Sequence, residues 1–436
     1  MYLTGIFISN IRSIKSLVWK IEAHEAPGWH VVIGDNGSGK SSILRSIAMA
    51  LIGESGAEAL QQNWNTYLRY ETKNGNIKID LLRNNTYDQF IREGVNPAQS
   101  LWRASIELTQ EENHEVHLKN LPVDGKGDAR DLHDKSFQQK SGWFSASYGP
   151  FRRFTGGDRE EERLRDAKPN IGRHLSLFRE NIALTESLRW LESLQFKKLE
   201  ADAEGALLDA IKLFINQAGF LPNDTRLHQV SSRGVQFVDG NGSNVLIEDL
   251  SDGYRSMLSM TLDLIRQLAL TYGPHKVFKQ NDRTRIHLPG IVLIDEIDVH
   301  LHPTWQRNVG LWFREHFPQI QFIVTTHSPL VCQASTIGTV YRLPTPGTDE
   351  EGKMITGMEL QRLQYGNILE AYGTELFGGA MTRSEESYNR LQRLAELNVK
   401  EMRGKLTTKE RQEQQQLRDT LPTTANAITE ETQVAL

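Results

Sequence analysis

A glycine-rich loop between an apolar strand and an amphipathic helix constrains the fold of this chain more than any other feature. The loop is GDNGSGKSS, Gly34–Ser42, and it fits the pattern G-x-x-x-x-G-K-[ST]. Val31–Ile33 is predicted to form the strand before it, and the helix after it is expected to end at Gly53. Such a strand–loop–helix unit is the nucleus of an α/β fold, so we predict an α/β protein.

The loop has the chemistry of a phosphate site. Its backbone N–H groups, at the start of a helix, form a concave anion site that suits the α- and β-phosphates of a nucleotide. Lys40 is expected to reach the β- and γ-phosphate oxygens, and the hydroxyl of Ser41 is expected to bind Mg²⁺. ATP and Mg²⁺ are therefore the expected cofactors. The residues expected around the phosphates are Asn36, Gly37, Ser38, Gly39, Lys40, Ser41 and Ser42.

Two further apolar strands end in residues that suit ATP hydrolysis. Ile291–Ile294 is followed by two acids, and a carboxylate at the tip of a parallel strand beside the phosphate loop is where Mg²⁺ needs a second anchor. We assign that role to Asp295, and to Glu296 the orientation and deprotonation of the attacking water. His327 follows the predicted strand Gln321–Val324, and we expect it to contact the γ-phosphate.

The stretch LSDGYRS, Leu250–Ser256, is predicted to begin a helix that ends at Gly273. Ser251 is expected to cap this helix, and Gly253 permits a close backbone approach. The helix N-terminus can then hold a γ-phosphate through its dipole and its free N–H groups. Because Lys40 and Ser251 lie far apart in the sequence, spacing alone does not decide which nucleotide Ser251 contacts.

Together, and in this order, these stretches resemble the ABC-type ATPase superfamily. Phe7–Leu17 (FISNIRSIKSL) and Asp295–Pro303 (DEIDVHLHP) resemble its RecF/SMC-like, AAA_21-like branch. The resemblance implies that the signature loop LSDGYRS closes on ATP held by another copy, in a head-to-tail dimer or a higher homo-oligomer. It also implies that Arg12 and Ser13 lie near the nucleotide and that Asp298 reaches across the dimer.

The glutamine loop of this superfamily has no clear match in the chain. Gln138, Gln139 and the stretch Ser145–Phe154 are the candidates. Within that stretch, Arg152 and Arg153 either approach phosphate or lie at the solvated surface, and the sequence does not decide between these alternatives.

His300 and His302, one residue apart, raise the question of a metal site. That spacing puts both rings on one face only in an extended strand, and no cysteine or suitably spaced carboxylate is near. We therefore expect a loop here and no metal. Pro303 is expected to begin the next helix, whose predicted buried face consists of Trp305, Val309, Trp312 and Phe313.

The pattern along the chain predicts a mixed phosphate-loop sheet with an antiparallel subdomain, a helical lobe and a helical C-terminal region. The stretches YLRYE, IKIDL, ASIEL and HEVHL alternate like strands, and no sustained heptad predicts a long coiled-coil arm. Helices are predicted at Met358–Glu370 and Ser384–Leu406, the second packing on its own core or docking another protein. The expected parts are ATPase lobe I at 1–157, a helical insertion at 158–225, ATPase lobe II at 226–343, a helical partner-docking region at 344–422 and a disordered tail at 423–436.

Charge and cysteine content limit the ligands and the cellular compartments that are expected for this chain. A net charge of −5 over 436 residues gives no general electrostatic footprint for nucleic acid, and acids interrupt the basic strip Arg152–Arg173. Cys332 is the only cysteine, which excludes internal disulfides and agrees with a reducing cytoplasm. No apolar run approaches the roughly 20 residues that span a bilayer, and no signal-peptide pattern is present, so we expect a soluble cytoplasmic protein without membrane contact.

The sequence after His327 contains no acid cluster of the TOPRIM type and no His-Asn-His set, so we expect no nuclease site in this chain. The whole arrangement is similar to the PtuA-type ATPases of Septu and retron-associated antiphage systems. That resemblance implies an ATPase, producing ADP and phosphate, that regulates a PtuB-like HNH nuclease, with nucleic acid as a further partner through the complex. The alternative is a RecF/SMC-like repair ATPase that binds DNA directly. A transporter subunit is disfavoured by the signature loop and the long insertion.

Overall fold

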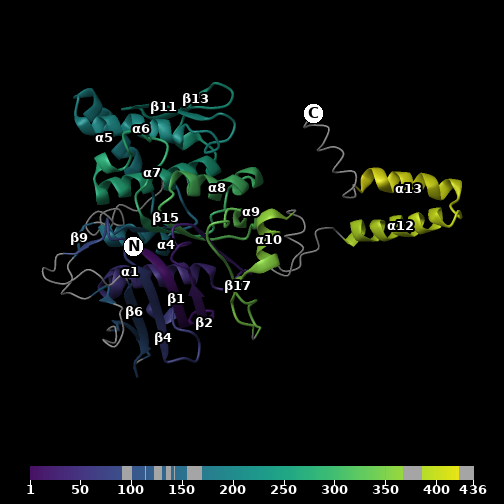
Figure 1. Cartoon of the computed structure of the whole chain (residues 1–436), viewed down its shortest axis with the longest axis horizontal. Helices are drawn as coiled ribbons and strands as arrows, with labels where there is room; N and C mark the ends of the chain where they lie inside the picture. Colours follow the sequence, from purple (N-terminus) through teal and green to yellow (C-terminus); the bar gives the residue numbers. More distant parts are fainter. Residues whose placement is uncertain are drawn as a thin grey trace. The chain divides into compact units, whose positions relative to one another are not determined.

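The computed structural model describes residues 1–90, 101–112, 114–121, 130–133, 139–141, 143–154, 169–348, 350–366 and 385–421. The chain divides into two compact units, Met1–Ala371 and Tyr372–Leu436 (Figure 1). The second unit contains two helices joined by a short turn, α12 (Glu385–Met402) and α13 (Thr408–Thr420). Among the described residues, no helix is both long enough and apolar enough to cross a membrane.

A mainly parallel sheet forms the centre of the first unit. Its strand order is β10-β14-β15-β3-β16-β17, and only β17 is antiparallel to its neighbour. Every residue of the three central strands is buried, as expected for a sheet covered on both faces. The bounds are β10 (Ser145–Tyr148), β14 (Gly290–Ile294), β15 (Ile320–Thr325), β3 (Trp29–Ile33), β16 (Val340–Arg342) and β17 (Lys353–Ile355). The strands predicted from their apolar runs are confirmed.

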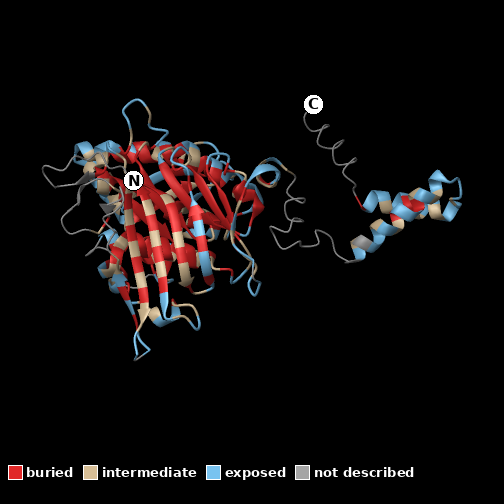
Figure 2. Cartoon of the chain, turned by 60° about the horizontal axis from the view of Figure 1, so that its bottom comes forward, coloured by how far each residue is buried: buried red, intermediate tan, exposed pale blue. Residues whose placement is uncertain are grey.

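An antiparallel sheet lies beside it, with the order β2-β1-β4-β6-β7 and β8 paired to β6. Buried and less buried residues alternate along β4 and β6 (Figure 2), because successive side chains point to opposite faces. The bounds are β1 (Tyr2–Ile11), β2 (Ile14–Lys20), β4 (Asn74–Leu82), β6 (Leu101–Gln110), β7 (Val116–Asn120) and β8 (Arg130–Asp131). The two sheets confirm the predicted α/β class and its antiparallel subdomain.

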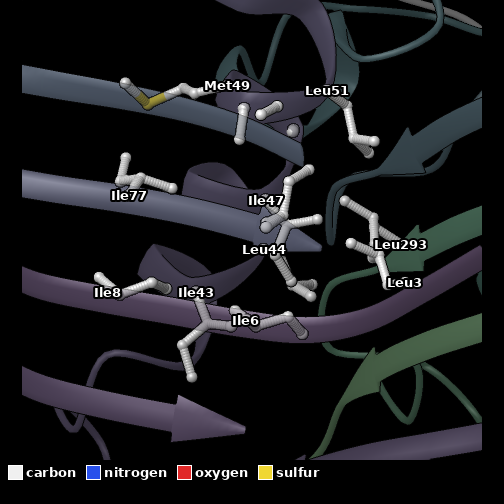
Figure 3. Close-up of a cluster of buried hydrophobic side chains, with 14 of the residues drawn as sticks. Leu3, Ile6, Ile8, Ile43, Leu44, Ile47, Met49, Leu51, Ile77 and Leu293 are labelled. Atoms are coloured by element: carbon white, nitrogen blue, oxygen red, sulfur yellow. The ribbon is translucent and has the colours of Figure 1, made fainter. Parts of the chain in front are cut away.

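Helix α1 (Lys40–Ala59) lies between the two sheets and joins their cores. Figure 3 shows Ile43, Leu44 and Ile47 of α1 among apolar side chains of β1, β4 and β14. Each such side chain, fully buried, contributes roughly 1.5–3 kcal/mol to folding. The predicted end at Gly53 is observed as a kink with φ 73°, after which a second helical segment continues to Ala59.

The prediction of a strand at YLRYE is wrong. Those residues follow a short 3₁₀ turn, η1 (Trp64–Thr66), which the side chain of Asn63 begins by accepting a hydrogen bond from the N–H of Asn65. The carbonyl of Tyr67 then accepts from the N–H of Arg12 at 2.8 Å. Local turn chemistry and this tertiary contact outweigh the strand propensity of the two tyrosines.

Helices cover the other face of the parallel sheet, and a small sheet packs against two of these helices, α5 and α6. In α8, Phe313 contacts the sheet through Trp29 and Phe322, and Trp312 contacts Phe214 of α6. The small sheet has the order β11-β12-β13. The bounds are α5 (Glu186–Leu199), α6 (Ala206–Ile215), β11 (Arg226–Ser231), β12 (Gly234–Val238), β13 (Asn244–Leu246), α7 (Asp252–Tyr272) and α8 (Pro303–His316).

The remaining elements are short. They are β5 (Gln89–Phe90), β9 (Gln139–Ser141), α3 (Pro169–Gly172), α4 (Leu175–Phe178), η2 (Ala203–Gly205), η3 (Ile247–Asp249), η4 (Pro274–Lys276), α9 (Pro329–Cys332) and α10 (Gly357–Tyr365). Helices occupy the described part of the expected insertion, and their Phe196 and Leu213 are 56% and 48% exposed. The end of the helix predicted at Met358–Glu370, and the expected tail at 423–436, lie outside the described residues. The expected part boundaries stay predictions.

Two buried histidines make the stability of the fold depend on pH. His30 in β3 has both ring nitrogens within hydrogen-bond distance of protein oxygens, and burial lowers its pKa to about 4. Burial, and then the charge of Arg173, lowers the pKa of His174 to about 3. The unfolded chain binds protons at these sites near pH 6.5 and the folded chain does not, so the free energy of unfolding falls as the pH drops from 6.5 towards 4.

Urea-induced unfolding at pH 7 and pH 5 tests this expectation. We expect the variant His30→Gln to lose about 2 kcal/mol less stability on acidification than the unaltered chain, because one depressed pKa has been removed. His24→Gln, at an exposed position, is the matched control and should show the unaltered drop. An identical drop in both variants would contradict the depressed pKa of His30.

Candidate active site

The phosphate loop connects β3 to α1 and wraps around the ammonium group of Lys40. Gly37 and Gly39 have φ values of 78° and 108°, which side chains with a Cβ atom rarely adopt. Nζ of Lys40 donates to the carbonyl oxygens of Gly34 and Asp35 at 2.8 and 3.0 Å. The hydroxyl of Ser38 is buried and has no hydrogen-bond partner among the described residues. The loop thus holds donors that a phosphate can recruit.

The turn between β1 and β2 packs against this loop. A Cβ atom on Gly39 would lie 2.6 Å from Oγ of Ser13, so the Ser13 side chain packs closely against the backbone of Gly39. The guanidinium of Arg12 lies over the ring of Tyr67, 3.9 Å from its centroid, and the φ of Arg12 is 49°. Ser13 therefore lies against the phosphate loop, and a nucleotide contact of Arg12 stays a prediction.

The ends of β14 and β15 are tied together by Thr325, a residue that the sequence motifs did not single out. Its hydroxyl donates to Oδ1 of Asp295 at 2.6 Å and accepts from the N–H of Glu296 at 2.7 Å. Asp295 is 2% exposed, and Glu296 is half-buried with φ 47°. The only sequence signal for Thr325 is its place at the end of a strand, two residues before His327.

The electrostatics of the site show that its charged groups lie close together. Burial raises the pKa of Glu296, and the charges of Asp295 and Asp298 raise it further, whereas Lys40 lowers it. Burial lowers the pKa of Lys40, and Glu296 and Asp295 oppose that shift. Burial, and then Lys40, lowers the pKa of His327. The structure thus gathers, at one edge of the parallel sheet, residues from the ends of three strands.

The loop after β14 is held within the same chain. Oδ1 of Asp298 accepts from the hydroxyl of Thr326 at 2.6 Å, and Oδ2 accepts from the N–H of His327 at 3.4 Å. A role of Asp298 across a dimer stays a prediction. Further along, Nδ1 of His302 accepts from the N–H of Thr304 at 3.4 Å and caps α8.

The expected absence of a metal at His300 and His302 stays a prediction. Among the described residues, no group of three or more His, Cys, Asp or Glu side chains is arranged to hold a metal ion. The predicted helix start at Pro303 is confirmed. The expected buried face is also observed, with Trp305, Val309, Trp312 and Phe313 at 7%, 1%, 5% and 0% exposure.

Helix α7 begins where expected, but the side-chain capping bond expected from Ser251 is not observed. Ser251 occupies the N-cap position, and its side chain makes no capping hydrogen bond. The carboxylate of Asp252 in the first turn complements the helix dipole instead, and it pairs with Arg255. A Cβ atom on Gly253 would lie 2.7 Å from the carbonyl oxygen of His300, so glycine allows α7 to approach that loop.

A cleft of about 640 Å³ opens beside Ser251. Residues of α7, α8 and the loop before α8 line it, including Gly253, Tyr254, His300 and Trp305. The rings of Tyr254 and Trp305 lie 5.4 Å apart within this cleft. The signature loop therefore borders an open surface of its own chain.

The candidates for the glutamine loop give a mixed result. Gln138 and the side chain of Gln139 lie outside the described residues. Arg152 does not lie at the solvated surface, because it is 4% exposed and donates to the carbonyl oxygens of Asp295 and Glu296 at 2.8 and 3.1 Å. Its approach to phosphate stays a prediction. Arg153 is exposed and donates to the carbonyl of Glu180 at 3.3 Å.

The chain is similar in sequence to a family of known proteins and to several curated relatives. The AAA_21 family model, described as "AAA domain, putative AbiEii toxin, Type IV TA system", matches residues 30–333, from the strand before the phosphate loop to beyond His327. Septu protein PtuA of Bacillus mycoides (strain KBAB4) is 28% identical over 340 residues, which are 76% of this chain and 38% of that protein. Retron Ec83 probable ATPase of Escherichia coli is 40% identical over 113 residues, which are 26% of this chain and 20% of that protein.

The chain spans less than half the length of the curated relatives that it matches. Among solved structures, the SmcHead bound to the C-winged helix domain of ScpA is similar with a TM-score of 0.47 and 15% identity. That alignment covers 81% of this chain and 97% of the solved chain.

Proposed function

The chain belongs to the AAA_21 family of AAA-type domains, and from this premise we propose that it binds and hydrolyses ATP as a dimer and thereby regulates an associated nuclease. The observation that carries the proposal is the gathering of Lys40, Asp295, Glu296 and His327 at one sheet edge. The relatives named Septu PtuA and retron ATPase support the setting, which we propose is antiviral defence in the cytoplasm.

The residues present fit Mg²⁺. Ser41, in the first turn of α1, and Asp295, buried at the end of β14, offer a hydroxyl and a carboxylate oxygen, which are the hard donors that Mg²⁺ prefers. When bound, Mg²⁺ neutralises charge on the β- and γ-phosphates. Thr325 orients the Asp295 carboxylate by donating to its Oδ1.

The proposed hydrolysis uses the other groups of the site. Lys40 exchanges its bonds to the loop carbonyls for phosphate oxygens, and His327 donates to the γ-phosphate. Glu296 accepts a proton from water, whose oxygen attacks the γ-phosphorus as the bond to ADP breaks. The raised pKa of Glu296 makes its carboxylate a stronger base than an ordinary one.

The proposed dimer follows from the signature loop. Ser251 is exposed, makes no capping bond and borders an open cleft, so a second copy can reach it with its bound ATP. A helix N-terminus stabilises phosphate charge, which suits closure of α7 on a γ-phosphate. No observation favours the repair alternative over this proposal.

A positively charged side chain at the signature loop should prevent closure of the dimer without affecting ATP binding by one head. We expect Ser251→Arg to leave ATP binding by one head unchanged within about twofold and to lower turnover at least about tenfold, because the bulky cation blocks closure. Nucleotide titration and phosphate release measure the two quantities. Ser243→Arg, in the exposed turn between β12 and β13, is the control.

Mixing variants tests whether the site is shared. Ser251→Arg mixed with Lys40→Ala should leave at most one competent site in each mixed dimer and restore part of the turnover. Wild-type turnover by Ser251→Arg alone would show that the loop acts on no partner nucleotide.

The regulatory part of the proposal needs its own experiment. A tagged chain is co-expressed with the product of an adjoining HNH reading frame, and retention of that product and its DNA cleavage are measured with ATP and without nucleotide. We expect co-purification and cleavage that depends on nucleotide. Cleavage by the nuclease that ignores both the chain and ATP would overturn the regulatory role.

A further inference from the structure

Arg152 is a buried cation that contacts three parts of the site at once. Its Nη1 donates to the carbonyl oxygens of Gly149 and Asp295 at 3.0 and 2.8 Å. Its Nη2 donates to the carbonyl oxygen of Glu296 at 3.1 Å, and its Nε donates to Oγ of Ser256 at 3.0 Å. One planar side chain thus joins the loop after β10, the end of β14 and the helix α7.

The contact to Ser256 connects the catalytic acids with the signature loop. Ser256 is 1% exposed and lies on α7 little more than one helical turn after Ser251. A guanidinium holds its five N–H donors in a fixed, planar fork, so its bonds on two sides constrain each other. A shift of α7 relative to β14 must break or move the bonds of Arg152.

The backbone of Glu296 needs such support. Its φ of 47° lies in the left-handed region, which a residue with a Cβ atom occupies only when its surroundings hold it there. Thr325 accepts from the N–H of Glu296, and Arg152 donates to its carbonyl oxygen, so the residue is held at both ends. The direction of the Glu296 side chain depends on these two contacts.

We propose that Arg152 is a positioning residue that couples helix α7 to the backbone of Asp295 and Glu296. Contact of Ser251 with the nucleotide of a second copy then sets the Glu296 carboxylate for proton transfer. This inference rests on the proposed ATP hydrolysis by a dimer. Arg152 touches no reacting atom and acts through the peptide groups to which it donates.

The charge environment agrees with a cation at this place. Burial lowers the pKa of Arg152 to about 10, while Asp295, Asp298 and Glu296 raise it, so the side chain stays protonated at neutral pH. A buried charge costs more than an apolar side chain of similar size unless it is paired and hydrogen-bonded. Packing alone would not require an arginine.

Two conservative variants separate coupling from folding. Arg152→Lys keeps the charge but cannot bridge the four acceptors, and Ser256→Ala removes only the bond to α7. Arg153→Lys, at the neighbouring exposed position, is the matched control. The full chain is used, and the unfolding midpoint, the affinity for a non-hydrolysable ATP analogue, KM and kcat are measured for each variant.

We expect Arg152→Lys to lower kcat at least about tenfold with the analogue affinity within about twofold. Ser256→Ala should lower kcat about threefold or more at an unchanged unfolding midpoint. The double variant should be no slower than Arg152→Lys alone, because that change already cuts the connection. Arg153→Lys should match the unaltered chain.

Other outcomes overturn the inference. If Ser256→Ala has the same kcat as Arg153→Lys, Arg152 does not couple α7 to the acids. This comparison tests the inference even if Arg152→Lys fails to fold. A lower unfolding midpoint with unaltered kcat in folded Arg152→Lys would assign it a structural role only. Failure of the proposed function gives a different result, because in that case the unaltered chain itself hydrolyses no ATP.

Discussion

The variant Glu296→Gln is expected to bind ATP with unaltered affinity and to hydrolyse it at least about a hundredfold more slowly. Glutamine keeps the size and the backbone contacts of the residue but cannot accept the proton of the attacking water. Both ends of the Glu296 peptide group are held by other residues, so the substitution should leave the loop in place. Phosphate release measures turnover, and nucleotide titration measures affinity.

The same variant should also accumulate the closed dimer. Size-exclusion chromatography with ATP and Mg²⁺ should show a larger species for Glu296→Gln than for the unaltered chain, because hydrolysis no longer reopens it. Glu315→Gln, an exposed acid on α8, is the control and should behave as the unaltered chain. Unchanged turnover in Glu296→Gln would remove Glu296 from the role of base.

The variant Lys40→Ala is expected to weaken ATP binding by about a hundredfold, which corresponds to roughly 3 kcal/mol. Lys40 is 7% exposed, and its ammonium group lies among the carbonyls of the phosphate loop. Without it, the β- and γ-phosphates lose a charge-assisted partner, and the carbonyl oxygens of Gly34 and Asp35 lose their donor. Turnover should disappear with binding.

The control for this variant is Lys15→Ala, an exposed lysine on β2. Thermal unfolding is compared for both, since a collapse of the loop would also abolish binding. Retention of ATP binding by a folded Lys40→Ala variant would show that the loop does not hold the triphosphate as proposed.

Much of the fold was predictable because its signals are local. Apolar runs at Val31–Ile33 and Ile291–Ile294 predicted the central strands, and helix starts at Asp252 and Pro303 followed from turn and proline chemistry. The error at YLRYE has a physical cause. Its tyrosines carry strand propensity, but the turn at Asn63 and the contact of Tyr67 with Arg12 decided the backbone there.

The candidate site also contains residues that the sequence predicted and residues that it did not. Lys40, Asp295 and Glu296 stand in motifs whose residue types and spacing predict their chemistry. Thr325 and Arg152 carry no such signal, because their roles arise only when β10, β15 and α7 meet the end of β14.

By itself, the sequence determined the strand–loop–helix unit, the order of the motifs and the identity of the charged groups, since each depends on neighbours within a few residues. Only the tertiary structure decided that Arg152 is buried and that Asp298 binds Thr326 and His327 of its own chain. The bonds of Arg152 and Asp298 join segments that are distant in sequence, and their geometry exists only once the sheet and helices have packed. No local pattern encodes such a distance.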